Sequence, residues 1–510
     1  MRLAARSLTV TVAAFAVFLS VALVSTTTAA VKLLLTGTTV LVMGGTGNSL
    51  SPAEDTDEFV QNYLSSAVGN YVAPASTLST GIPDGPYNAV AVVTPEQFAP
   101  NTGTLTFDQS VALGQQNLDN CIKGTSCNYN TEVGSVAPAP GDDFVVYGFS
   151  QSSTIATLEK RTLAAEYAVG DGPDVSFVLI ANGNRPNGGF LSRGPAGVTI
   201  PWFLQFGGAT FSGPTPTNTQ YSTVDIAAQY DGWSDFPENP LNLLADINAM
   251  MGITYLHLGG VYADTSLTSP GVIDQGQYGD THYYLISTPI LPILMPLENF
   301  GTLGYALADT LDPTLRVIIE SSYDRSISPG QPTSWNIFYV ENPVKLTKDF
   351  IEAIPVGLDN GIQDLFGVRP FRTTRPGPYG VGGPAVTYTD SETTDTTSAS
   401  STTAASTSTS TTTGSSSSSD DSASSTDSTA STSTTAGVAH FKPRTSTTST
   451  ATTPSTSTTA AAATESGSKS GASDSSKSSA SAKSSASSTS STSTHSGVGS
   501  SKRAKASSSS

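Results

Sequence analysis

Short runs of apolar, mostly β-branched residues recur along the first part of the chain, and residues typical of turns bound them. The clearest runs are Thr38–Met43, Ala89–Val93, Phe144–Tyr147 and Val175–Ile180. A strand that is covered on both faces carries apolar residues at consecutive positions, as the strands of a parallel sheet do. These runs therefore predict the buried strands of a mostly parallel central sheet.

Segments with apolar residues at helical spacing lie between these strands. The clearest are Phe107–Ile122 and Gln151–Ala168, and the second contains neither Pro nor Gly. Strands that alternate with helices indicate an α/β fold in which helices flank the sheet. After residue 185 Gly and Pro become frequent, so we expect a loop-rich C-terminal part. Within it we expect a short strand at Ile253–Leu258, and either a lid, a substrate wall or an irregular subdomain over Val261–Pro296.

The N-terminal residues 1–30 have the order of a secretory signal peptide. Arg2 and Arg6 form a basic start, Leu8–Val24 is apolar, and small residues follow up to Ala30. An uncleaved membrane anchor is the alternative, although the apolar stretch is near the lower length limit for a span. We therefore expect a protein that is secreted or associated with the cell envelope.

Composition separates the domain that folds from a tail. Residues 31–384 have the length of one large α/β domain. Residues 385–510 are rich in Ser, Thr and Ala, bury too little apolar surface to offset their chain entropy, and are expected to be disordered. This tail is either a spacer, with or without O-glycosylation, or an unselected extension. The formal net charge of −18 argues against a nucleic-acid partner.

The chain has two cysteines, Cys121 and Cys127. In an exported protein such a pair closes a small loop as a disulfide, and two free buried thiols are the alternative. Neither cysteine has a His at ligand spacing, so we expect no metal site, and nothing in the sequence calls for a cofactor.

The strongest chemical signal is the sequence Gly148-Phe149-Ser150-Gln151-Ser152, which joins a predicted strand directly to a predicted helix. A nucleophilic serine needs this strand–turn–helix context, because the sharp turn projects its hydroxyl above the sheet. The flanking positions are small because strand and helix pass close together there. We therefore expect Ser150 to be a nucleophile; an ordinary turn with a helix-capping Ser is the alternative.

An oxyanion formed at Ser150 needs two backbone N–H donors. One is expected from Gln151, the residue after the nucleophile. The second is expected from the glycine-rich loop that follows the first strand, at Gly45 or Thr46, because glycines let the backbone approach a ligand closely. A phosphate-binding turn or a plain loop is the alternative, although the full phosphate-binding motifs are not matched.

A serine nucleophile needs a base and an acid. The base is His257 or His282, because the remaining histidines, His440 and His495, lie in the tail. The acid should precede the base in the chain. The candidates in that interval are Asp225, Asp231, Asp235 and Asp246, of which Asp231 lies in a turn suited to the edge of a sheet.

With these residues identified, the sequence resembles the PE-PPE domain family of mycobacteria and related actinobacteria, which are serine α/β-hydrolases similar to cutinases and lipases. The resemblance covers most of residues 38–340. It rests on the following blocks: Gly148-Phe-Ser-Gln-Ser, Asn182-Gly-Asn-Arg-Pro-Asn-Gly-Gly, Tyr230-Asp-Gly-Trp-Ser-Asp-Phe-Pro, Gly279-Asp-Thr-His-Tyr-Tyr-Leu-Ile, Tyr323-Asp-Arg and Pro329-Gly-Gln-Pro-Thr.

The resemblance implies an α/β-hydrolase fold and assigns roles to three positions. It maps the nucleophile to Ser150, the acid to Asp231 with Asp235 as competitor, and the base to His257. In the family the position of His282 is commonly Thr. The chain departs from many members because it lacks the N-terminal PE or PPE module and carries the signal-like segment instead.

The function that these features predict is that of a secreted serine esterase or lipase, which hydrolyses acyl (fatty acid) esters through a Ser-Asp-His triad and an acyl-enzyme. An acyltransferase of cell-envelope lipid assembly uses the same site with another acceptor. A non-catalytic cell-surface binding protein is the alternative from another class, and a peptidase is a further one. The expected partner is accordingly an acyl ester or lipid substrate.

Overall fold

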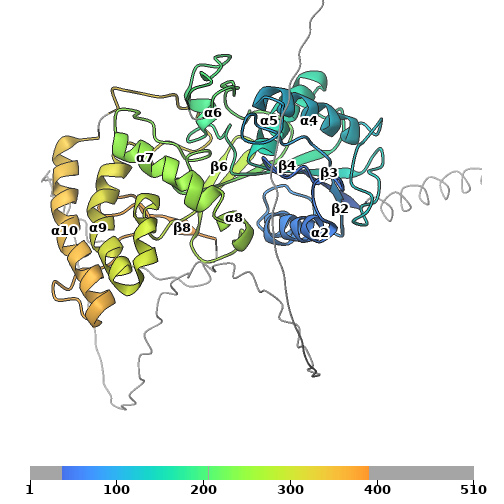
Figure 1. The fold of residues 1–510 in the computed structure, drawn as a ribbon. Helices are drawn as coiled ribbons and strands as arrows, with labels where there is room; N and C mark the ends of the chain where they lie inside the picture. Colours follow the sequence, from blue (N-terminus) through green and yellow to red (C-terminus); the bar gives the residue numbers. More distant parts are fainter. Residues whose placement is uncertain (1–36, 205, 340, 390–510) are drawn as a thin grey trace, which may run out of the picture. The chain divides into compact units, whose positions relative to one another are not determined.

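The computed structural model describes residues 37–204, 206–339 and 341–389 (Figure 1). The expected signal peptide at 1–30, the tail beyond residue 389, and with it His440 and His495, lie outside the described residues.

The described residues contain a sheet of eight strands in the order β2-β1-β3-β4-β5-β7-β6-β8. Strands from β2 to β7 in this order run parallel, and β6 and β8 join antiparallel at the edge. The strands are β1 Thr38–Val42, β2 Tyr87–Ala91, β3 Asp143–Phe149, β4 Val175–Ile180, β5 Thr223–Ala228, β6 Val272–Tyr278, β7 Thr281–Ile286 and β8 Thr387–Tyr388. The prediction of a mostly parallel sheet is confirmed, and each of the expected strands before residue 185 is present.

Helices flank both faces of this sheet. Figure 1 shows α4 and α5 together on one side and α2 on the other. The helices are α2 Asp57–Ser66, η1 Ala67–Val72, α3 Ala73–Thr77, α4 Phe107–Ile122, α5 Gln151–Glu166, α6 Phe190–Arg193, α7 Leu243–Gly252, η2 Ile253–His257, α8 Val261–Asp264, η3 Pro292–Phe300, α9 Gly301–Glu320 and α10 Pro343–Phe366. The α/β fold expected from the sequence is therefore confirmed.

Alternate residues of the central strands point to the two faces, as the period of a strand requires. In β1, Val40 and Val42 pack in the apolar cluster that includes Tyr71 of η1. Leu41, between them, packs in a second cluster that includes Ile155 of α5. Because both faces are covered, the strands carry apolar residues without alternation, which is the pattern that predicted them.

The expectation of a loop-rich C-terminal part is only partly met. Most of the stretch between β4 and β5 is irregular, but α9 and α10 form two long helices that pack side by side (Figure 1). The two glycines of α10 are contact positions rather than breaks: a Cβ at Gly361 would lie 2.6 Å from Ala306 O, and one at Gly357 would lie 2.1 Å from Thr310 O. None of the helices in the described ranges combines the length and the apolar character that a bilayer crossing requires.

Two further expectations after residue 185 are wrong. The predicted strand Ile253–Leu258 is helical, because η2 continues α7 without a break. The segment Val261–Pro296 is not an irregular subdomain, because it contains the antiparallel hairpin of β6 and β7, and β7 pairs with β5 within the sheet. Most of its Gly and Pro residues lie outside these strands, and Gly276 lies within β6. The sheet also extends past residue 384, since Thr387 and Tyr388 pair with β6.

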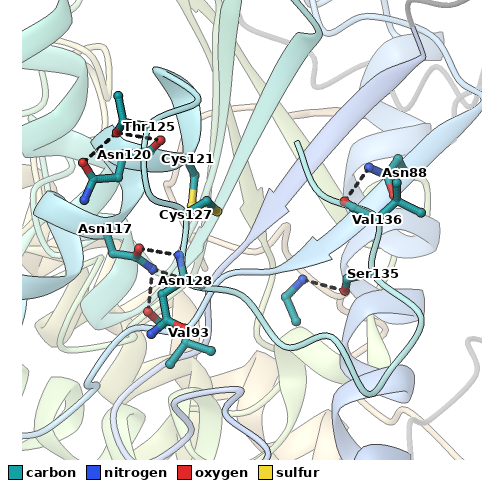
Figure 2. The surroundings of a disulfide bond; sticks show 11 residues. Asn88, Val93, Asn117, Asn120, Cys121, Thr125, Cys127, Asn128, Ser135 and Val136 are labelled. Atoms are coloured by element: carbon teal, nitrogen blue, oxygen red, sulfur yellow. Dashed lines mark hydrogen bonds between the residues drawn. A yellow bond between two sulfur atoms is a disulfide. The ribbon is translucent and has the colours of Figure 1, made fainter. Parts of the chain in front are cut away.

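Cys121 and Cys127 are joined by a disulfide bond at the end of α4 (Figure 2). The turn that it closes leads into Asn128, whose carbonyl accepts a hydrogen bond from Val93 N at 3.0 Å. The side chain of Asn117 donates to Val93 O and to Asn128 O, both at 2.8 Å. The bond therefore lies where α4 is fastened to the strand end beyond β2.

Candidate active site

Ser150 lies in the sharp turn between β3 and α5. Its φ of 58° and ψ of −111° are outside the ordinary regions for a residue with a side chain, and such a conformation costs about 1–3 kcal/mol. Its backbone N–H donates to Ile180 O at 3.0 Å, which fastens the turn to β4. The surrounding structure therefore maintains a strained turn that lifts the Ser150 hydroxyl above the sheet.

The residues on either side of Ser150 make this turn possible. A Cβ at Gly148 would lie 2.7 Å from Ser152 O, so only glycine fits where strand and helix cross. The hydroxyl of Ser152 accepts from Phe149 N at 2.8 Å and donates to Phe149 O at 3.1 Å. The Ser at the second small position thus braces the turn with its side chain.

His257 is the last residue of η2 and reaches Ser150 from another part of the chain. Its Nε2 lies 2.7 Å from Ser150 Oγ. Its ring stacks on Phe149 with 5.4 Å between ring centroids, which sets the plane of the imidazole. Ser150 and His257 are both largely buried, with 8% of each residue exposed.

Asp231 follows β5 and lies on the other side of the imidazole. Its Oδ2 is 2.9 Å from His257 Nδ1, and the residue is fully buried. Burial alone would raise the pKa of Asp231, but the charge of His257 and the hydrogen bonds that the carboxylate accepts lower it below its ordinary value. A carboxylate at Nδ1 favours the tautomer in which Nε2 is free to accept the proton of Ser150.

Two residues that the sequence analysis missed also bind Asp231. Tyr262 OH donates to Oδ2 at 2.7 Å, and Ser234 Oγ donates to it at 2.8 Å. Tyr262 OH in turn accepts from Ala228 N at 2.8 Å, so it is anchored to the end of β5. Tyr262 had no recognisable signal in the sequence, whereas Ser234 is in the Tyr230–Pro237 block that was noted for other reasons.

The alternative acids and the alternative base lie elsewhere. Asp225, inside β5, pairs with Arg185 and accepts from Asn182 Nδ2 at 2.8 Å. Asp235 binds Arg325 at 2.8 Å. His282, in β7, lies 2.7 Å from Asp274 Oδ1. None of these three candidates contacts Ser150 or His257 in the described structure.

The predicted oxyanion residues come together beside Ser150. Gln151 Nε2 donates to Thr46 Oγ1 at 3.1 Å, which ties the glycine-rich loop to the start of α5. Gly45 packs on Phe149, where a Cβ would lie 2.7 Å from the ring. Within the described ranges, the backbone N–H groups of Thr46 and Gln151 donate to no protein acceptor. Such free donors are what a developing oxyanion requires.

Glu96 is buried directly behind this loop. Its backbone oxygen accepts from Gly47 N at 2.8 Å, and its Oε1 accepts from Thr94 Oγ1 at 2.7 Å. Its Oε2 is buried without a partner. Burial raises the pKa of Glu96 to about 8, so the side chain is largely protonated at neutral pH.

One cavity in the described residues is separate from these side chains. It measures about 360 Å³ and is lined by, among others, Arg185, Gln275, Arg325 and Tyr379, but by neither Ser150 nor His257. The hydrogen-bonded geometry marks the candidate site, because a reacting hydroxyl is recognised by its base and not by cavity size. No group of His, Cys, Asp and Glu suited to a metal ion is present within the described ranges.

Comparison with known proteins yields a family and several relatives. Residues 85–324 match the model of the PE-PPE domain. The chain is 37% identical over 337 residues to the esterase PE16 of Mycobacterium tuberculosis, which is 64% of this chain and 57% of that protein. It is 36% identical over 346 residues to an uncharacterized PPE family protein of the same species, PPE42, covering 67% of this chain and 54% of the relative.

A more distant relative carries a different activity in its name. The SL1278 acyltransferase Chp1 of Mycobacterium tuberculosis is 29% identical over 242 residues, which is 46% of this chain and 54% of that protein. The chain thus spans little more than half the length of the relatives that it matches. The relatives named here thus include one esterase and one acyltransferase.

Proposed function

This chain is a PE-PPE domain protein, and from that premise we propose that it is a serine hydrolase of acyl esters with Ser150 as nucleophile, His257 as base and Asp231 as acid. The observation that carries the proposal is the continuous line of hydrogen bonds from Ser150 Oγ through His257 to Asp231. A hydroxyl in such a line becomes a nucleophile at neutral pH, whereas a helix-capping serine needs no imidazole.

In the first step His257 Nε2 takes the proton of Ser150 Oγ while the oxygen attacks the ester carbonyl carbon. The carbonyl oxygen becomes an oxyanion, which the N–H groups of Gln151 and Thr46 stabilise. Asp231 stabilises the imidazolium that forms. When the intermediate collapses, the bond to the alcohol oxygen breaks, that oxygen takes the proton from His257, and an acyl-enzyme remains on Ser150.

In the second step the hydroxyl of an acceptor molecule gives its proton to His257 and attacks the carbonyl carbon of the acyl-enzyme, which releases Ser150. Water as acceptor releases the carboxylic acid, whereas an alcohol gives a new ester. The second candidate function is therefore acyl transfer in cell-envelope lipid assembly, which the acyltransferase names of Chp1 and of the diacyltrehalose acyltransferase Chp2 favour. Both functions use the same triad and a lipid or other acyl ester as substrate.

The location and the domain division belong to the same proposal. We propose that residues 1–30 direct export, that 31–384 with the adjoining strand β8 form the hydrolase domain, and that the Ser/Thr-rich tail extends from it. The order of basic, apolar and small residues at the N-terminus supports export. The mass of the protein recovered from the culture medium and from the envelope of an expressing actinobacterium tests whether residues 1–30 are removed.

The decisive experiment is hydrolysis of a series of p-nitrophenyl acyl esters by the full chain and by its Ser150→Ala variant. Ser65→Ala, at an exposed position of α2, is the matched control. We expect activity in the parent and in the control, and its loss in Ser150→Ala. Mass spectrometry in the presence of a primary alcohol then separates the two functions, because a transferase forms the alkyl ester in place of the free acid.

Equal background rates in folded parent and folded Ser150→Ala protein would remove Ser150 from its role. A non-catalytic surface protein, which keeps the scaffold for binding, would then be the better interpretation. Fluorophosphonate labelling provides an independent readout, because it depends on an activated serine and not on the choice of ester.

A further inference from the structure

Asp235 lies in the same loop as Asp231 but has a different task from that of the triad acid. Its Oδ2 accepts a hydrogen bond from Tyr230 N at 2.9 Å. Its own backbone N–H donates to Asp231 O at 2.6 Å. The carboxylate of Asp235 therefore closes the loop on which Asp231 is carried and holds the residue immediately before it.

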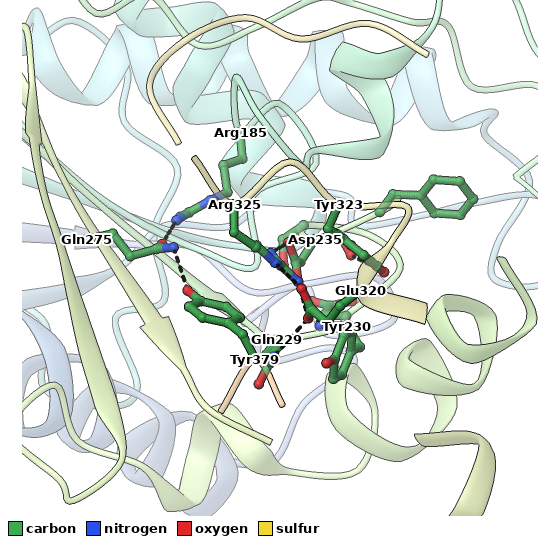
Figure 3. Close-up of polar contacts among 12 residues, drawn as sticks. Arg185, Gln229, Tyr230, Asp235, Gln275, Glu320, Tyr323, Arg325 and Tyr379 are labelled. Atoms are coloured by element: carbon green, nitrogen blue, oxygen red, sulfur yellow. Dashed lines mark hydrogen bonds and ion pairs between the residues drawn. The ribbon is translucent and has the colours of Figure 1, made fainter. Parts of the chain in front are cut away.

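Arg325 binds this carboxylate through two nitrogens. Nη1 donates to Asp235 Oδ1 at 2.8 Å and Nη2 donates to Oδ2 at 3.1 Å. The same guanidinium binds Glu320, the last residue of α9, with Nε 2.9 Å from Oε2 and Nη2 3.1 Å from Oε1. Figure 3 shows Arg325 among these carboxylates. Only a planar guanidinium satisfies two carboxylates in this way; a lysine ammonium does not.

Aromatic rings enclose this ion-pair group. The Arg325 guanidinium lies 4.2 Å from the ring centroid of Tyr323 and 5.1 Å from that of Tyr379. The side chains of Arg325, Asp235 and Glu320 are 12%, 5% and 10% exposed. Removal of one member from such a buried group leaves the others uncompensated, so the group acts as a unit.

The backbone that this unit holds is a strained one. Tyr230, a residue with a bulky side chain, has a φ of +69°, in the left-handed region that such residues avoid. A conformation of this kind persists only where its surroundings impose it. The hydrogen bond from Tyr230 N to Asp235 is one such restraint, and Arg325 fixes the position of its acceptor.

We propose that Arg325 is a positioning residue for the triad acid: through Asp235 it holds the Tyr230–Asp231 turn so that the Asp231 carboxylate meets His257 Nδ1. The proposal rests on the proposed function, since it assigns a partner to the same triad. It also gives a task to the Tyr323-Asp324-Arg325 segment, which contacts neither Ser150 nor His257 in the described structure.

The test compares Arg325→Gln and Arg325→Lys with the parent enzyme. Arg325→Gln removes the positive charge and part of the paired hydrogen bonds of the guanidinium. If Asp231 is displaced by about 1 Å as a result, kcat should fall about 10²-fold at unchanged KM. Arg325→Lys restores the charge but not the paired contacts, so its kcat should lie between the two. The second readout is the downfield proton resonance of His257 Nδ1–H, assigned by its absence from a His257→Gln variant. We expect Arg325→Gln to shift or abolish it.

Arg369→Gln is the matched control, because Arg369 is a comparably buried arginine, 19% exposed, that pairs with Asp359. It should lower stability but leave kcat and the resonance unchanged. A folded Arg325→Gln enzyme with parental kcat and an unshifted resonance would overturn the proposal, as would an equal loss of kcat in Arg369→Gln. If Arg325→Gln does not fold, Asp235→Asn takes its place, and an unshifted resonance there would overturn the proposal equally.

The resonance also separates this inference from the proposed function. A parent protein that hydrolyses no ester, but whose His257 resonance is lost in Arg325→Gln, would refute the function and leave the positioning role intact. An active parent enzyme whose His257 resonance is unchanged in Arg325→Gln would support the function and refute the positioning role.

Discussion

Replacement of Asp231 by Asn isolates the charge of the triad acid. Hydrogen bonds from His257 Nδ1, Tyr262 OH and Ser234 Oγ converge on Oδ2, whereas Oδ1 accepts from Trp233 N at 2.9 Å. An Asn side chain satisfies most of these donors with its carbonyl oxygen at the Oδ2 position and its amide facing Trp233 N. The His257 tautomer is then preserved, and the main loss is the negative charge; Trp233 N also loses its acceptor, because it faces the Asn amide.

The magnitude follows from the distance. Nδ1 and Oδ2 are 2.9 Å apart, so the centres of charge of imidazolium and carboxylate are about 4 Å apart. At an effective dielectric constant of about 20, their attraction is about 4 kcal/mol. This attraction exists only after His257 has taken the proton, so its loss lowers kcat about 10³-fold with little change in KM. A reversed tautomer would cost about 10⁴-fold.

The assay is steady-state hydrolysis of a p-nitrophenyl ester between pH 5 and 9, with the mass of the variant checked for deamidation back to Asp. Because the pKa of Asp231 lies below its ordinary value, the parent carries the negative charge on this carboxylate throughout this range. Asp225→Asn is the control, as Asp225 is buried in β5 away from His257. A folded Asp231→Asn enzyme within about tenfold of the parent, or an equal loss in Asp225→Asn, would refute the reasoning.

Two further predictions concern stability. Burial raises the pKa of Glu96 from 4.5 to about 8, so between these values the folded protein keeps a proton that the unfolded chain releases, and stability falls by about 1.4 kcal/mol per pH unit. Glu96→Gln removes this contribution, so its advantage in urea unfolding should grow from pH 5 to pH 8; an advantage independent of pH would contradict the prediction. The disulfide closes a loop with a sequence separation of 6, so Cys121→Ala with Cys127→Ala should lower the free energy of unfolding by about 2 kcal/mol. Its kcat should stay at the parental value, and a large loss of activity would contradict a purely stabilising role.

The sequence was sufficient where the signal is local. A nucleophile elbow is a strand, a turn and a helix in direct succession, so β3, Ser150 and α5 could be located from adjacent residues alone. The buried strands β1 and β4 were equally predictable, because a strand covered on both faces carries an uninterrupted apolar run.

The sequence was insufficient where glycine and proline have a packing role. In α10 the glycines lie at the contact with α9, and Pro355 lies within the helix, yet the same residues indicate loops when the partner helix is unknown. The residues of η2 favour a strand locally, and they are helical only because they continue α7.

The sequence by itself determined the order of strands and helices in the first half of the chain, the turn that presents Ser150, and a short set of candidates for its partners. Which of these candidates lie close together is a property of the tertiary structure alone. His257 meets Asp231 and Ser150 across sequence separations of 26 and 107 residues, which no periodicity records. Asp231 and Asp235 lie four positions apart in one turn, and the fold gives them different partners. The Asp231 carboxylate faces the His257 imidazole, and the Asp235 carboxylate faces the Arg325 guanidinium. Residues of identical chemistry acquire different roles from the partners that the fold brings to them.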